Sequence, residues 1–262
     1  MLDLMSFEKQ SLHYCWLLLL GLLSSLLVNA QQPLPEEYVR ARINPDSRLF
    51  NGREYIRNGT PAKGSPFFES DSLQLGSLSY DGILYRDIAL EYDMISDELI
   101  IHNFAGDALI SLTPEKIAFF SIAGHRFRYI APAGVTPTPA AIVPPALATA
   151  GVAPAAPNLP EPGFYEELYA TPQLALLARR KKALIFPSSQ DEQPKYVQAD
   201  RYFLLIDANA YSIHNENDLL TALKDKKDPL KKFIRKNKLS FKRQHFENSL
   251  IQTTIYYQEI KR

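Results

Sequence analysis

The chain of 262 residues contains one cysteine, Cys15, and one tryptophan, Trp16, and both lie within its first thirty residues. The rest of the chain has no cysteine, which excludes disulfides, thiolate nucleophiles and cysteine-ligated zinc from it. Its stability must therefore come from packing. Aromatic residues make up 11% of the chain and supply material for a core.

The sequence also lacks the motifs that identify common enzyme classes. It contains no HExxH, HxH, GxSxG, Walker loop or GxGxxG pattern. Four histidines lie beyond residue 30, and no two of them are within twenty residues of each other: His102, His125, His214 and His245. The turn at 93–97 lacks the alternating ligands and central glycine of a calcium loop. We therefore expect no catalytic residue, no metal ligand and no cofactor.

The first thirty residues have the layout of a secretory signal peptide. An apolar run of thirteen residues, Trp16–Val28, is followed by small residues at Val28 and Ala30. This run is short of the ~20 residues that span a bilayer. We expect residues 1–30 to be removed, leaving no transmembrane span in a protein that is periplasmic, outer-membrane associated or extracellular. A buried N-terminal helix and an uncleaved anchor are the alternatives, and a start at Met5 would give a less acidic leader.

The formal net charge is zero, but the charges are unevenly distributed. Residues 224–243 hold ten lysines or arginines and two aspartates, a net charge of +8. Such a segment either contacts phosphates or an anionic membrane surface, or is a solvated helical face. The neutral total and the export signal argue against nucleic acid as a partner.

Residues 31–130 are predicted to form a β-rich domain. Asp81-Gly82 lies between two alternating apolar runs, which is a strong hairpin signal. Strands 8–12 residues apart favour an antiparallel meander sheet, a sandwich or an open barrel. The expected strands are 53–57, 73–75, 77–80, 83–85, 88–92, 99–102, 109–112, 117–122 and 126–130.

Residues 131–162 differ from both neighbours, because they are mostly Ala, Pro, Val and Thr. Nine prolines oppose regular structure, so we expect a linker or a long surface insertion. Residues 163–214 are predicted to return to β-hairpins, which either continue the same sheet or form a second core. Expected strands are 163–169, 173–182, 202–206 and 211–214, with a turn at 208–210 and the basic run 179–182 at a solvated strand edge.

The spacing of apolar residues changes to a helical period in residues 215–262. We expect a short helix capped by Asn217 or Asp218, then one beginning with Asp228 as N-cap and Pro229 at its first position. Leu230, Phe233 and Ile234 fall on one face of this second helix. A final helix over 243–258 presents Phe246, Leu250, Ile251, Thr254 and Tyr257.

Nine aromatic residues lie on predicted strands and allow two interpretations. Aromatic side chains on one exposed sheet face can stack on sugars or peptides, whereas ordinary cross-strand packing buries them. The nine are Tyr80, Tyr85, Tyr92, Phe119, Phe127, Tyr129, Phe164, Tyr165 and Tyr169.

Three segments together resemble a group of known sequences. They are 80–93 with 97–100, the run 163–169, and the basic helical tail ending in Tyr256-Tyr257. In these the chain resembles uncharacterised exported β-rich proteins of Bacteroidota, over residues 48–130 and 163–258. That group has no known activity, so the resemblance implies export and a β-rich fold and assigns no site residue.

The sequence therefore predicts a mainly β (α+β) protein with a small C-terminal helical segment. We expect an exported, non-enzymatic binding or structural protein of the cell envelope. Its partner is an envelope protein or an anionic membrane surface, contacted through Lys231, Lys232, Arg235 and Lys236. The alternative is a glycan-acting hydrolase using paired carboxylates, which would need two carboxylates facing each other in a cleft.

Overall fold

A computed structural model of the chain describes residues 48–57, 59–103, 108–131, 161–188, 192–207 and 209–261. The expected signal peptide and residues 132–160 of the Pro/Ala-rich segment lie outside the described residues. Among those described, no helix is both long enough and apolar enough to cross a membrane.

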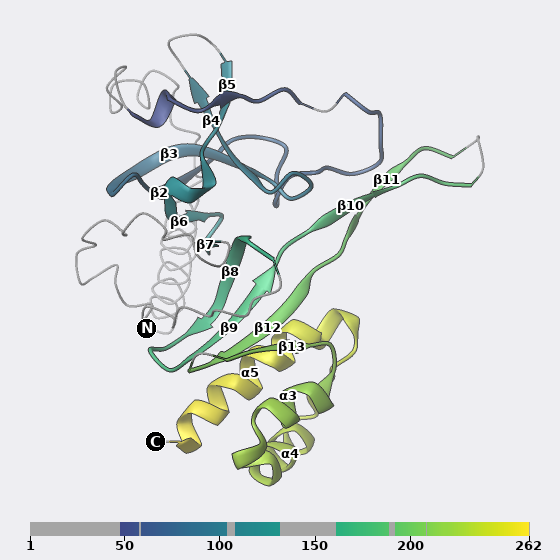
Figure 1. Cartoon of the computed structure of the whole chain (residues 1–262). Helices are drawn as coiled ribbons and strands as arrows, with labels where there is room; N and C mark the ends of the chain where they lie inside the picture. The colour runs from purple at the N-terminus through teal and green to yellow at the C-terminus, as the bar shows by residue number, and fades with distance from the viewer. Residues whose placement is uncertain are drawn as a thin grey trace, which may run out of the picture. The chain divides into compact units, whose positions relative to one another are not determined.

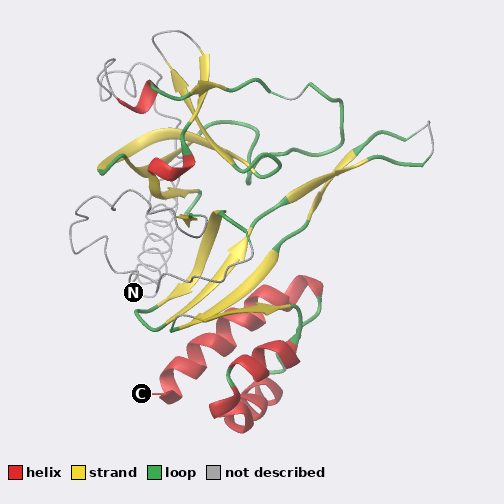
Figure 2. Cartoon of the chain, in the orientation of Figure 1, coloured by secondary structure: helices red, strands yellow, loops and turns green. Residues whose placement is uncertain are grey.

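Antiparallel β-structure dominates, as the sequence predicts, and three helices follow it (Figures 1 and 2). One open sheet has eleven strands in the order β1-β5-β4-β3-β2-β6-β7-β8-β9-β12-β13, and β10 and β11 form a separate pair. The strands are β1 (Arg53–Glu54), β2 (Gln74–Tyr80), β3 (Ile83–Asp93), β4 (Glu98–Asn103), β5 (Ala108–Ser111), β6 (Ile117–Ile122), β7 (His125–Ile130), β8 (Gly163–Ala170), β9 (Leu174–Arg179), β10 (Lys182–Ile185), β11 (Lys195–Gln198), β12 (Arg201–Ile206) and β13 (Asn209–Ile213). The helices are α3 (Glu216–Ala222), α4 (Lys227–Lys236) and α5 (Arg243–Lys261), with 3-10 turns η1 (Arg48–Phe50), η2 (Pro114–Lys116) and η3 (Lys224–Lys226).

The hairpin predicted at Asp81-Gly82 is confirmed. Tyr80 pairs with Ile83, and both turn residues have positive φ, 49° and 78°, as a two-residue type I′ turn requires. Each flanking strand is continuous, so the expected division into 73–75 and 77–80 and into 83–85 and 88–92 is wrong. A bulge at Asp87, which also has positive φ, bends β3 without ending it.

The two β-rich stretches share one sheet. Strand β7 pairs with β8 in antiparallel register, with Ile130 opposite Gly163. The Pro/Ala-rich segment therefore connects two neighbouring strands, which is the topology of an insertion in a hairpin and not of a linker between two domains. Both stretches also belong to one compact unit.

A buried ion pair lies beside Gly163, the first residue of the strand that follows this insertion. The Arg179 guanidinium meets the Asp97 carboxylate through two hydrogen bonds of 2.7 and 2.6 Å and also donates to the Phe164 carbonyl at 2.7 Å. Gly163 has a φ of +135°, and a Cβ there would lie 2.2 Å from Asp97 Oδ2 and 2.3 Å from Arg179 Nη2. Only glycine leaves room for this pair. The solvated edge expected for residues 179–182 is thus wrong for Arg179, which is 2% exposed, and for Arg180, which is 8% exposed.

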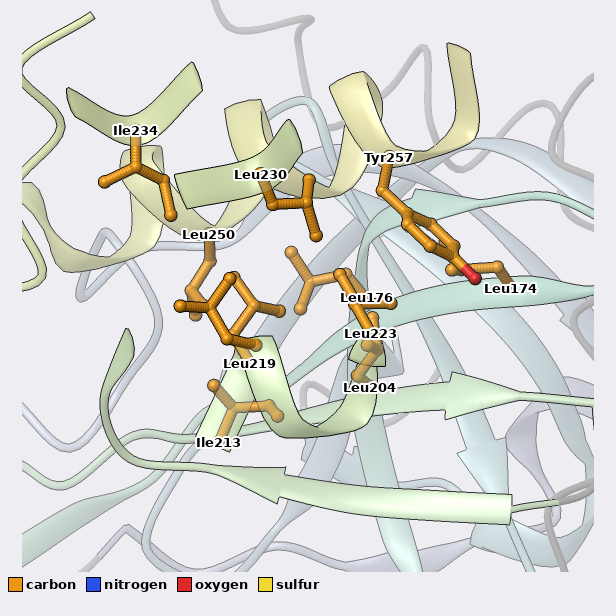
Figure 3. Packing of buried hydrophobic residues seen from close by; sticks show 11 residues of the cluster. Leu174, Leu176, Leu204, Ile213, Leu219, Leu223, Leu230, Ile234, Leu250 and Tyr257 are labelled. Atoms are coloured by element: carbon orange, nitrogen blue, oxygen red, sulfur yellow. The ribbon is translucent and has the colours of Figure 1, made fainter. Parts of the chain in front are cut away.

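The helices cover one face of β9, β12 and β13 and enclose a leucine-rich core (Figure 3). Leu174, Leu176 and Leu204 project from the sheet toward Leu230, Ile234, Leu250 and Tyr257. The apolar faces predicted for the second and third helices are confirmed, since Leu230 and Ile234 of α4 are buried. Leu250, Thr254 and Tyr257 of α5 are buried as well.

Some boundaries in the C-terminal region differ from expectation. Asn215, not Asn217 or Asp218, caps α3, because its side chain accepts a hydrogen bond from the Asp218 N–H. Helix α4 begins at Lys227, so Asp228 and Pro229 lie inside its first turn. The reason is that η3 runs directly into α4 and replaces a separate cap. The expected turn at 208–210 is also wrong in part, since Asn209 already pairs with Ile206 in β13.

The remaining strands bury an aromatic cluster. Tyr92, Phe120, Phe127 and Phe164 have ring centroids 4.7–5.8 Å apart. Of the nine aromatic residues singled out from the sequence, six are buried: Tyr80, Tyr92, Phe119, Phe127, Phe164 and Tyr165. Cross-strand packing accounts for those six, so they do not form an exposed stacking platform.

Candidate functional site

The four basic residues singled out from the sequence share the solvent face of α4. Leu230 and Ile234 point into the core. At 3.6 residues per turn, Lys231, Lys232, Arg235 and Lys236 lie on the side of the helix opposite to Leu230. All four are exposed, and none of their side chains has an ion pair or hydrogen bond with another described residue. We call this set the α4 basic face.

Neighbouring residues reinforce the charge of the α4 basic face. Five more basic side chains before and after it are exposed: Lys224, Lys227, Lys238, Lys242 and Arg243. Of the two acidic residues in this segment, Asp225 accepts a hydrogen bond from the Tyr257 hydroxyl, while Asp228 is exposed. Arg235 and Lys236 also lie in the last turn of α4, where positive charge complements the helix dipole.

A second candidate site, which no sequence pattern indicates, is a pocket beside the junction of β9 and β10. Its volume is about 410 Å³. It is lined by residues from six segments of the chain: Phe68, Glu69, Met94, His125, Arg180, Lys182, Gln198 and Glu247. We call it the Arg180 pocket.

An ion-pair network forms one wall of the Arg180 pocket. Arg180 Nε donates to Glu166 Oε2 at 2.5 Å. Its Nη1 lies 2.7 Å from both Asp200 Oδ2 and Glu247 Oε2. Burial alone would lower the pKa of the guanidinium, but the hydrogen bonds to Glu247 and Glu166 outweigh it and raise that pKa. Arg180 is therefore a permanent cation facing three carboxylates.

Glu247 ties α5 to the sheet within this network. Besides the ion pair with Arg180, it accepts a hydrogen bond of 2.9 Å from the Tyr202 hydroxyl of β12. Burial would raise the pKa of Glu247, but the Arg180 pair and the Tyr202 bond hold that pKa below its usual value. Glu247 is therefore ionised near neutral pH.

His125 extends the network toward the opening of the pocket. Its Nδ1 lies 2.5 Å from Glu166 Oε1, and its side chain is 38% exposed. Because a carboxylate only accepts hydrogen bonds, Nδ1 carries a proton. On the other side of the pocket Lys182 Nζ donates to the Phe67 carbonyl at 2.7 Å, and burial lowers the pKa of this lysine.

Neither site has the donor set of a metal centre. The described residues contain no group of three or more His, Cys, Asp or Glu side chains placed to hold a metal ion. His102 lies within β4, and His214 sits beside Asp218 at the start of α3, 3.2 Å from its carboxylate.

No protein-family model, no curated protein and no solved structure matches this chain.

Proposed function

We propose that this is an exported protein of the cell envelope that works by binding, and that the α4 basic face contacts an anionic surface. The surface is either the phospholipid headgroups of a membrane or an acidic envelope protein. The observation that carries the proposal is the set of four exposed, unpaired basic side chains on one helix face: Lys231, Lys232, Arg235 and Lys236.

Physical chemistry favours a phosphate-rich surface for this face. Lysine and arginine side chains near an anionic membrane each contribute about 1 kcal/mol of attraction. Side chains that already have carboxylate partners would have to give them up on binding, whereas these four do not. The attraction acts within a Debye length of ~8–10 Å at moderate ionic strength, so binding should weaken as salt is added.

The glycan-hydrolase alternative is less well supported by the Arg180 pocket. Two carboxylates, Glu69 and Glu247, line this cavity. A glycosidase needs one carboxyl group whose pKa is raised, so that it donates a proton to the leaving group. The pKa of Glu247 is lowered instead. Binding through the α4 basic face therefore remains our proposal.

Charge reversal on the α4 basic face tests this proposal in cells. The variant carries Lys231→Glu, Lys232→Glu, Arg235→Glu and Lys236→Glu. We expect most of it to leave the envelope fraction while its circular dichroism stays that of the wild type. Its urea midpoint should fall only slightly, because the four side chains have no hydrogen bond or ion pair with a described residue and lose only the favourable interaction of Arg235 and Lys236 with the helix dipole. Unchanged fractionation of a folded variant would contradict the proposal.

Two double variants with the same change in net charge test whether binding depends on the α4 basic face or on the total charge of the protein. Lys232→Glu/Arg235→Glu changes the α4 basic face, and Arg86→Glu/Lys195→Glu changes two exposed basic residues on strands β3 and β11. Flotation with vesicles with and without phosphatidylglycerol is the measurement. We expect only the first variant to lose binding to the anionic vesicles, by roughly tenfold or more. Wild-type binding to envelope extract but not to these vesicles would assign the face to an acidic protein.

A further inference from the structure

The Arg180 pocket offers carboxylate oxygens to which no described residue donates a hydrogen bond. The Glu69 side chain has no hydrogen bond or ion pair with a described residue. Glu247 binds both Arg180 and Tyr202 through Oε2, which leaves Oε1 unused by the described residues. The His125 Nδ1–H donates to Glu166 Oε1, which holds the imidazole ring at the opening of the pocket. A ligand that binds both Glu69 and Glu247 must bring donors.

The charge of the pocket favours a cationic donor. Around the cavity the ionised side chains are two cations, Arg180 and Lys182, and four carboxylates: Glu69, Glu166, Asp200 and Glu247. These six side chains together carry a net charge of −2, and a protonated His125 would still leave −1. The Lys182 ammonium, which donates to the Phe67 carbonyl, offsets part of the charge of Glu69 and Asp200 and is included in this sum. Excess negative charge in a recessed, partly buried site attracts a cation more strongly than it would at a flat surface.

The pocket also has an apolar wall. Phe68 and Met94 line it and are 4% and 2% exposed, so both side chains are fixed by the core. The Phe68 ring also packs against the His125 ring, with 5.1 Å between the centroids. A cavity of about 410 Å³ falls within the range usual for small-ligand sites. An apolar wall beside convergent acceptors suits a ligand with a hydrocarbon stem and a charged end.

We propose that the Arg180 pocket binds a primary alkylammonium group, as found on a lysine-type side chain or a small diamine. The ammonium donates to Glu69 and Glu247. The methylene stem packs on Phe68 and Met94. This inference is independent of the α4 basic face, which uses other residues and a partner of the opposite charge.

Isothermal titration of the purified full chain with three probes tests the proposal. The probes are cadaverine, lysine capped at both backbone ends, and n-pentanol, which has a hydrocarbon stem but no charge. We expect both amines to bind and pentanol not to bind. Tighter binding of capped lysine would identify a peptide-borne side chain as the ligand, and tighter binding of cadaverine a free amine.

Two carboxamide variants locate the site. Glu69→Gln removes a carboxylate that has no hydrogen bond or ion pair with a described residue, so we expect this variant to fold. Glu259→Gln, at an exposed and unpaired position on α5, is the matched control. We expect Glu69→Gln to weaken amine binding about tenfold, as for the loss of one charged hydrogen bond, and Glu259→Gln to leave it unchanged.

Several results would overturn the proposal. One is no heat and no binding with either amine at millimolar concentration. Another is equal binding of pentanol, which would show a purely apolar site. A third is equal weakening by Glu69→Gln and Glu259→Gln, which would show attraction to the overall charge of the protein. Glu247→Gln provides a second check, since a folded variant that binds amines as tightly as the wild type also contradicts the assigned geometry.

Discussion

Two adjacent arginines occupy sites of opposite character. Arg179 is the last residue of β9 and Arg180 follows it, so their side chains leave the strand on opposite faces. Arg179 pairs with one carboxylate, Asp97, and with backbone carbonyls of Pro162 and Phe164. Arg180 pairs with three carboxylates and lines a cavity.

The difference between these arginines shows how charge balance separates a structural ion pair from a binding site. One guanidinium and one carboxylate cancel at Arg179, and Gly163 brings the backbone so close that nothing else fits. At Arg180 one cation faces three carboxylates, and the uncancelled charge borders open space. Substitutions that change the packing should therefore lower the stability that the closed Arg179–Asp97 pair provides. Changes of pH and added ligands should act on the open network around Arg180.

The largest expected effect comes from filling the space at the closed site. Gly163→Ala places a methyl group 2.2 Å from Asp97 Oδ2, so the ion pair must separate or the strand must shift. Breaking a buried pair costs about 3 kcal/mol or more, and we expect a loss of that order in the free energy of unfolding. Urea unfolding followed by circular dichroism measures it.

Gly82→Ala measures the cost of a side chain at a left-handed glycine with open space around it, although its φ of +78° is less strained for alanine than the +135° of Gly163. Gly82 also has positive φ, but a Cβ there would meet no atom within 4 Å. We expect it to cost about 1 kcal/mol, the usual penalty of a left-handed conformation. If the two substitutions lowered the free energy of unfolding equally, the Arg179–Asp97 pair would contribute nothing to the loss at Gly163 beyond the strain in the backbone.

The parts of this fold that depend on local pattern could be predicted from the sequence. Alternation and the Asp81-Gly82 turn identified the strands around the first hairpin, and helical spacing identified the α4 core residues Leu230, Phe233 and Ile234. The same spacing placed the α4 basic face, because charges at 231, 232, 235 and 236 fall opposite that core. Strand interruptions were misjudged where a bulge at Asp87 lets the ladder continue.

The Arg180 pocket could not be predicted, because its members are distant in the sequence. Phe68 and Glu247 are separated by most of the chain, and they meet only because the sheet orders its strands β7-β8-β9-β12 and α5 folds back on it. A basic run at a strand end usually marks a solvated edge. Only the carboxylates of other strands, such as Glu166, reveal that Arg180 is buried. The β10–β11 pair was missed for a different reason, because both strands have four residues and lack an alternating pattern.

An intermediate loss in the free energy of unfolding is expected when acid protonates Glu247 in the network around Arg180. The pKa of Glu247 is lower in the folded protein than its usual value, because of Arg180 and Tyr202 despite the opposing effect of burial. The ion pair therefore stabilises the fold fully above the unfolded-state pKa of about 4.3, and this stabilisation is lost as pH falls through the folded pKa. Since Glu247 is a third exposed, Glu247→Gln should cost about 1–2 kcal/mol near neutral pH.

The pH dependence of that loss is what identifies its cause. Urea midpoints of wild type and Glu247→Gln should differ at neutral pH and converge as the pH falls through the lowered folded-state pKa of Glu247, where the wild-type carboxylate is protonated as well. Glu259→Gln on the same helix should match the wild type throughout. A difference between wild type and Glu247→Gln that stays constant with pH would assign the role of Glu247 to shape and not to charge.

The smallest effect is expected at the rim of the closed site. Arg201 Nη2 lies 2.6 Å from Glu161 Oε2, close in sequence to Gly163, but both side chains are more than 40% exposed. Arg201→Ala should change the free energy of unfolding by less than about 0.5 kcal/mol, because solvent competes for an exposed pair. Raising the salt to ~1 M should remove even that difference, whereas the loss in Gly163→Ala should persist because its cause is steric. If Arg201→Ala lowered the free energy of unfolding as much as Gly163→Ala, the exposed Arg201–Glu161 pair would stabilise the fold as strongly as the buried Arg179–Asp97 pair. That result would contradict the distinction between a closed ion pair and an exposed one.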